Sequence, residues 1–176
     1  MSLLKVDDIH TRAGTSNRGH ILQVVSTTYT ESAAYSISGM TWTEVAGLTT
    51  TITPSSTNSK ILVSVTMGGL ESSGLNQRMG VCLRRNSTNI AKNTDGGGTS
   101  HTKSSWAGIG SNSNDIKNQP SFTHLDSPST TSSVTYRIMI TTEGSYTLYI
   151  NRSSSNANSS SVFKTASSLT LYEVAA

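Results

Sequence analysis

Alternation of apolar and polar residues with a period of two most constrains the fold of this chain. In residues 60–67, KILVSVTM, apolar side chains occupy every second position from Ile61 to Met67. Side chains of a β-strand point alternately to opposite faces, so this pattern is typical of a strand with one face in a core. Residues 78–84 and 134–141 repeat it, and no segment sustains the 3.6-residue period of a helix. The sequence therefore predicts a protein built from β-strands.

Two polar connections lead into these strands, and each begins at a proline. Residues 54–59 read PSSTNS and residues 128–133 read PSTTSS. Proline cannot donate to a sheet ladder, and short polar side chains satisfy backbone groups in turns. Further strands are expected at residues 21–29, 43–53, 146–150 and 168–176, with a tight hairpin connection at residues 143–145. About eight to ten antiparallel strands indicate an all-β sandwich or jelly roll.

The chain divides into a short arm and one domain. Residues 1–20 hold little apolar surface beyond Leu3, Leu4, Val6 and Ile9, so we expect an arm that docks on a neighbour, followed by a β-sandwich over residues 21–176. Three polar segments interrupt the strand pattern and are interpreted as loops, which on a rigid scaffold either bind ligands or merely connect strands. They are Thr30–Thr41, Asn93–Asn118 and Ser153–Ser161.

Composition disfavours several function classes. About a third of the residues are Ser or Thr, only 13% are charged, and the net charge is +3 without a basic stripe, so nucleic-acid binding is not expected. No run reaches the length of a membrane span, and no secretory signal stands at the start. The single cysteine, Cys82, lies within an apolar alternation and is interpreted as a buried strand residue.

Catalytic, metal and cofactor motifs are not recognised. No histidine shows a metal-binding spacing and each is interpreted as a surface or loop residue, although His10 and His20 could gather on a symmetry axis if chains associate. The glycines after Asp95 lack the Lys-Ser/Thr of a phosphate loop, and polar turn chemistry is favoured over calcium binding near Asp115. Acidic residues are few, the sequence marks no two of them as a facing pair, and no nucleophile elbow occurs, so we predict no enzyme activity and no cofactor.

Aromatic residues in the polar segments are the candidate ligand contacts. Trp106 and Tyr35 could stack on the apolar face of a sugar ring, which would make them a glycan site. For Trp42, packing in a core or an interface is the preferred interpretation.

Several segments taken together resemble a known family. The segments GHILQVVSTT, ITPSSTNSKILVSV, LRRNSTNI, FTHLDSPSTTSSVTYRI, YINRS and LTLYEVAA are similar, in this order, to virion proteins of marine tailed bacteriophages, including cyanophages, often labelled tail-fibre or structural proteins. The resemblance spans most of residues 5–176, and the opening LLKVDDIHTRAGT resembles the family's usual start. It implies a jelly roll of the C1q/tumour-necrosis-factor type that forms a homotrimer, with the long segment 93–118 as a departure.

The resemblance further implies a role on the virus particle. The expected function is a virion structural protein, made in the host cytoplasm and exposed on the particle as a capsid decoration or a tail appendage. Its partners would be the major capsid protein or tail proteins, engaged through the arm. The alternative is a carbohydrate-binding module that recognises a host surface glycan through its loop aromatics. A polysaccharide-degrading enzyme is the third hypothesis.

Overall fold

The computed structural model consists of strands and connections and describes residues 19–94, 102–110, 118–160 and 162–176. Twelve strands and no helix occur in this part of the chain. The strands are β1 (Ile21–Tyr29), β2 (Ala33–Ile37), β3 (Thr43–Ile52), β4 (Lys60–Thr66), β5 (Leu70–Ser72), β6 (Arg78–Arg85), β7 (Thr88–Ile90), β8 (Trp106–Ile109), β9 (Ser121–Asp126), β10 (Val134–Thr142), β11 (Tyr146–Ile150) and β12 (Ser167–Val174).

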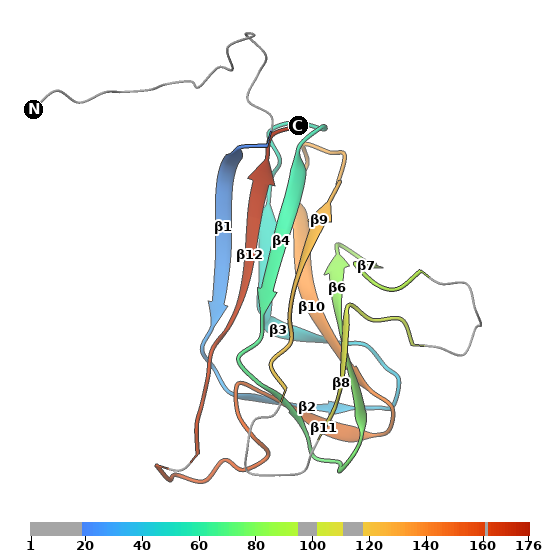
Figure 1. Cartoon of the computed structure of the whole chain (residues 1–176), viewed down its shortest axis with the longest axis vertical. Helices are drawn as coiled ribbons and strands as arrows, with labels where there is room; N and C mark the ends of the chain where they lie inside the picture. Colours follow the sequence, from blue (N-terminus) through green and yellow to red (C-terminus); the bar gives the residue numbers. More distant parts are fainter. Residues whose placement is uncertain (1–18, 95–101, 111–117, 161) are drawn as a thin grey trace, which may run out of the picture.

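Two antiparallel sheets form a sandwich, seen with its strands roughly vertical in Figure 1. The first sheet has the order β1-β12-β4-β9, and the second has the order β3-β10-β6-β7, with β8 also paired to β6. Counting β7 and β8 together and leaving aside β2, β5 and β11, the strands number one to eight, and the sheets read 1-8-3-6 and 2-7-4-5. Apart from β6 with β7 and β8, neighbours in each sheet are distant in sequence, as in the double Greek key of a jelly roll. The predicted fold class, an all-β antiparallel sandwich, is confirmed.

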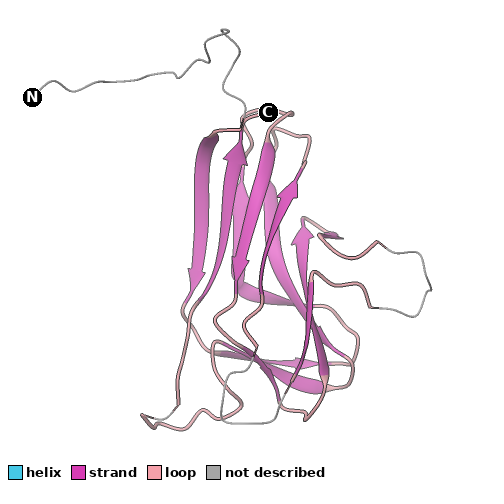
Figure 2. Ribbon diagram, viewed as in Figure 1, coloured by secondary structure: helices cyan, strands magenta, loops and turns pink. Residues whose placement is uncertain are grey.

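A third, smaller sheet of order β2-β11-β5 closes one end of the sandwich. Its strands come from three different connections, those between β1 and β3, between β4 and β6, and between β10 and β12. Figures 1 and 2 place it at the end away from the C-terminus. We call this end of the molecule the distal end and the opposite one the terminal end.

The core fills the space between the two main sheets, as the alternation predicts. Ile61, Val63 and Val65 of β4 are fully buried, and β10 contributes Tyr136 and Ile138 from the facing sheet. The prediction that Cys82 is a buried strand residue is confirmed, because its free thiol is buried in β6. Burial raises the pKa of this thiol. Burial of apolar side chains in such a core supplies most of the driving force for folding.

Three connections differ from the sequence-based prediction. Segment 30–41 contains β2, and segment 93–118 contains β8, although both were expected to be loops. Residues 143–145 do form a short turn, but β10 and β11 belong to different sheets, so the turn is not a hairpin. The physical reason is that β2 and β8 obtain their partners from distant strands, a contact that local alternation does not encode.

Candidate functional site

The predicted assembly arm lies outside the described residues, which begin at Gly19. Leu3, Leu4, Val6 and Ile9 therefore remain predictions, as do the interpretations of His10, Asp95 and Asp115. At the start of the described chain, the backbone N–H of Gly19 donates to the carbonyl oxygen of Ala175 at 2.8 Å. The backbone N–H of Ala175 donates in turn to the carbonyl oxygen of His20 at 2.9 Å. Gly19 and His20 thus lie beside the last strand at the terminal end.

Trp106 and Tyr35, the residues predicted to contact a glycan, lie in different parts of the fold. Trp106 is half-buried at the start of β8, opposite Val81, and its ring lies over Gly108. Tyr35 lies on β2 beside Tyr29, and burial, followed by the effect of Tyr29, raises its pKa. β8 extends one edge of the second main sheet, whereas Tyr35 contacts Ala46 of β3 at the opposite edge. The structure does not bring the two rings together into one platform.

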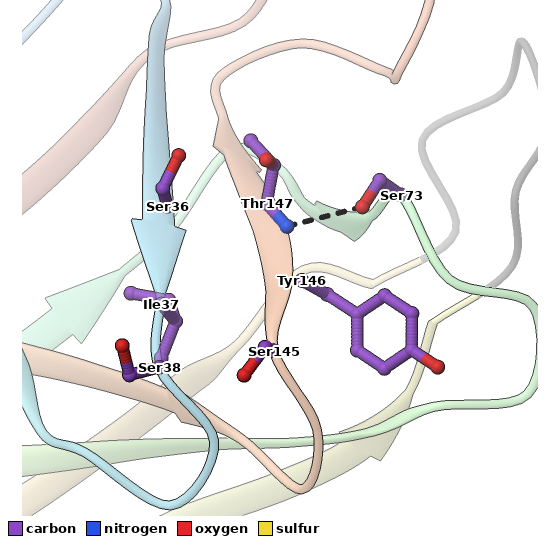
Figure 3. A pocket seen from close by; sticks show the side chains of 7 residues that line it. All are labelled: Ser36, Ile37, Ser38, Ser73, Ser145, Tyr146 and Thr147. Atoms are coloured by element: carbon purple, nitrogen blue, oxygen red, sulfur yellow. Dashed lines mark hydrogen bonds between the residues drawn. The ribbon is translucent and has the colours of Figure 1, made fainter.

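A groove lined by hydroxyl groups lies on the small sheet β2-β11-β5, which we call the end sheet (Figure 3). Its lining comes from β2, β11 and the residues after β5, and includes Ser36, Ser38, Ser73, Ser145, Tyr146 and Thr147. Two of these hydroxyls are already engaged, because Ser73 Oγ accepts from the N–H of Thr147 at 3.0 Å and Ser145 Oγ accepts from the N–H of Gly39 at 3.3 Å. These two hydrogen bonds help to hold the sheet β2-β11-β5 and its connections together.

The outer face of the sheet β1-β12-β4-β9 is divided into rows of different chemistry. Paired residues near the distal end are all hydroxyl-bearing, in the rows Ser26-Thr170-Ser64-Thr123 and Thr28-Ser168-Thr66-Ser121. The next row toward the terminal end is apolar across all four strands, and Leu22 and Val174 extend it. We call Leu22, Val24, Leu62, Leu125, Tyr172 and Val174 the apolar band.

The apolar band is open to solvent in the single chain. Val24 is 54% exposed and Leu125 is 55% exposed at the two edges of the sheet. An apolar surface that runs unbroken across four strands is typical of a surface that another molecule covers. Sequence reasoning missed the band because its members lie on four strands, each of which contributes one or two apolar residues to an otherwise polar face.

Two buried carboxylates hold the terminal end together, one beside each proline-led connection. Glu173 of β12 accepts from the N–H and the hydroxyl of Ser55 at 2.7 and 2.6 Å, and from the amide of Gln23 at 2.6 Å. Burial of this carboxylate raises its pKa, but hydrogen bonds from Ser55, Gln23 and Ser59 outweigh burial and lower the pKa to about 2. The connection at Pro54 is thereby anchored to the last strand.

The second carboxylate, Asp126, lies at the end of β9, just before the connection at Pro128. Both of its oxygens accept from the guanidinium of Arg85 at 2.9 Å, and one accepts from the hydroxyl of Tyr136 at 2.7 Å. Burial and the hydrogen bond to Asp126 raise the pKa of Tyr136, so the phenol stays protonated and donates. The group joins both main sheets, because Asp126 is in one and its partners are in the other.

Metal ligands and membrane spans are not apparent in the described part of the chain. Within residues 19–94, 102–110, 118–160 and 162–176, no three His, Cys, Asp or Glu side chains gather as metal ligands would. In the same residues there is no helix with the length and hydropathy needed to cross a membrane. Comparison with known protein families found no family model that matches the chain, and no curated protein matches it either.

Proposed function

We propose that this chain is an exposed virion structural protein of a tailed bacteriophage, assembled as a homotrimer and attached to the particle through residues 1–20. It serves as a capsid decoration or a tail appendage. The observation that supports the proposal most directly is the apolar band on the outer face of the sheet β1-β12-β4-β9. The virion role itself comes from the resemblance of the sequence.

Self-association explains why the band exists on a surface that is otherwise rich in hydroxyl groups. A second copy of the chain that packs on Val24 and Leu125 would remove from water an apolar area that the single chain leaves exposed. The band lies at the terminal end, close to the point where Gly19 pairs with Ala175. Contacts between copies and the attachment arm thus share one end, and the distal end faces outward.

Native mass spectrometry of the full chain tests the assembly. We expect a trimer for the wild type and a folded monomer for the double variant Val24→Ser, Leu125→Ser, because both changes remove apolar surface without touching the core. The matched control is Thr28→Ser with Thr123→Ser on the same two strands, which should remain trimeric. A wild-type chain that is monomeric at micromolar concentration would contradict self-association.

Purified particles test the attachment separately. A chain that lacks residues 1–20 should still fold, and we expect it to be absent from particles assembled in its presence. If the truncated chain is retained on particles, the arm is not the attachment. The number of copies per particle then distinguishes a capsid decoration from a tail appendage, since hundreds of copies indicate the capsid and a dozen or so indicate the tail.

A further inference from the structure

The apolar band lies next to the point where residues 1–18 connect to the domain. The backbone N–H of Gly19 donates to the carbonyl oxygen of Ala175, which ties the first described residue to the end of the chain. Two members of the band, Leu22 on β1 and Val174 on β12, lie just beyond this pair on adjacent strands (Figure 1). The part of the chain that precedes the described residues is therefore connected at the border of the band.

The chemistry of this preceding part changes along its length. Residues 10–18 read HTRAGTSNR and contain no large apolar side chain, whereas residues 3–9 read LLKVDDI. An apolar segment joined to a domain through a polar connection has a reason to dock wherever the domain exposes apolar surface, because docking removes both surfaces from water. The apolar side chains of the segment are Leu3, Leu4, Val6 and Ile9.

Lys60 adds charge complementarity at the edge of the band. It lies on β4 opposite Val174 of β12, so both side chains are on the outer face of the sheet. Its ammonium group donates to Ser127 Oγ at 2.9 Å, and none of the ion pairs within the described residues includes it. Residues 3–9 contain Asp7 and Asp8 beside their apolar side chains. A segment that is both apolar and acidic thus suits an apolar surface bordered by a lysine.

The polar connection is long enough to place residues 3–9 on the band. Neighbouring strands lie about 4.8 Å apart, so the band extends about 14 Å from Val24 on β1 to Leu125 on β9. A flexible connection with the length of residues 10–18 spans about 17 Å on average. The whole width of the band is therefore within reach of the segment of the same chain.

We propose that residues 3–9 dock on the apolar band of their own chain as long as that chain is unassembled. The tether decides between this segment and a second copy of the chain. A short flexible connection gives the segment an effective concentration in the millimolar range at the band, about a thousand times the concentration of other chains in a micromolar solution. The segment of the same chain is thus the first molecule to cover the band.

Docking of this kind would regulate assembly, a consequence that rests on the proposed homotrimer and its attachment arm. A second copy and residues 3–9 compete for the same apolar surface, so association of copies displaces the segment from the band. Displacement frees the segment for the virus particle, and a single chain keeps it occupied. Trimer formation and attachment are then coupled, because each favours the state in which the segment has left the band.

Disulfide trapping in the full chain tests the docking itself. In the double variant Ile9→Cys, Val24→Cys, we expect a disulfide within one chain after mild oxidation at a concentration where sedimentation shows monomers. The control Ile9→Cys, Thr51→Cys places the second thiol at an exposed position on the other main sheet and should form little of it. Cys82 is buried in β6 and does not compete. A disulfide between chains, or equal trapping in the control, overturns the proposal.

The strength of the trimer tests the competition. In the double variant Leu4→Ser, Ile9→Ser, the segment loses its affinity for the band, so the trimer should become more stable. We expect the concentration at which half of the trimer dissociates to fall about tenfold in analytical ultracentrifugation, as it would if the segment covered the band in most free chains. The matched control Thr11→Ser, Thr15→Ser, in the polar connection, should leave this concentration unchanged.

The direction of the change separates the possible occupants of the band. A trimer weakened by Leu4→Ser, Ile9→Ser would mean that the segment packs on a neighbouring copy, and an unchanged trimer would mean that it does not cover the band at all. Either result overturns the proposal. A wild-type chain that is monomeric at micromolar concentration would contradict the proposed homotrimer instead, and the disulfide experiment would still decide whether the segment docks.

Discussion

The two carboxylates at the terminal end of the sandwich differ from two buried hydroxyls at the distal end in how they are paired. At the terminal end, Glu173 and Asp126 are each held by three or more hydrogen bonds, and both anchor a proline-led connection. At the distal end, the hydroxyls of Thr141 and Thr165 are buried without partners among the described residues, and Met40 has a left-handed backbone. Other buried groups at the distal end are paired, since Asn151 donates to the carbonyl oxygens of Tyr29 and Glu31 and accepts from the hydroxyl of Ser167.

This difference indicates a division of labour within one fold. A polar network with every member satisfied stabilises and fixes one arrangement, whereas unsatisfied groups lower stability and persist where something else requires them. We therefore expect substitutions at the terminal end to change stability strongly. Substitution of the unpartnered groups at the distal end should leave stability constant or improve it.

Removal of the Asp126 carboxylate should have the largest effect. In Asp126→Ala, the guanidinium of Arg85 and the hydroxyl of Tyr136 both lose their partner inside the protein. Loss of one member of a buried ion pair typically destabilises by about 3–5 kcal/mol, and we expect about 3 kcal/mol because Arg85 is partly exposed. Urea denaturation of the variant and the wild type measures the difference. A loss below about 1 kcal/mol would show that the network is not what holds this end together.

The Glu173 carboxylate should make stability depend on pH. Its pKa in the folded protein is about 2, below the ordinary value of 4.5. The folded protein therefore binds this proton more weakly than the unfolded chain does. The stabilisation is fully present above pH about 4.5 and is lost as the pH falls toward 2. Denaturation midpoints measured across this range should fall with decreasing pH.

Glu173→Gln identifies the group responsible for that pH dependence. Glutamine keeps the shape but removes the charge, and it places a donor against Ser55 and Gln23, so we expect a loss of about 2 kcal/mol at neutral pH. The variant should also lose part of the acid dependence between pH 4.5 and 2. If wild type and variant fall in parallel over this range, another carboxylate is responsible.

The strands that face the core could be predicted from the sequence, because a two-residue period encodes burial directly. Residues 21–29 form β1 with the expected bounds, and the alternating residues Ile61, Val63, Val65 and Met67 line the core as predicted. The end sheet could not be predicted, since β2 and β5 are short and find their partners only through β11. The cavity lined by Met40, Arg78 and Thr141 was equally hidden, because these residues come from the connection before β3, from β6 and from β10.

Relief of the unfavourable groups at the distal end should stabilise the protein by a smaller amount. Thr141→Val removes an unpartnered buried hydroxyl, and Met40→Gly removes a side chain from a left-handed residue. Each should raise the free energy of unfolding by about 1 kcal/mol. Because the sites lie in contact with one pocket, the double variant need not be additive. Destabilisation by both variants would show that the distal end is as well satisfied as the terminal end.

The ion pair at the distal rim should have the smallest effect on stability and therefore forms the sharpest contrast with Asp126. In Glu143→Gln, Arg78 loses its partner, but its guanidinium stays in water because 81% of the side chain is exposed. Exposed ion pairs gain little beyond what solvent already supplies, and salt screens them further. We expect no measurable shift of the urea midpoint at physiological ionic strength, although the pKa of Glu143 is lowered by Arg78. A clear loss of stability in this variant, comparable with that of Asp126→Ala, would mean that carboxylates at both ends hold the sandwich together and that the rim pair is structural.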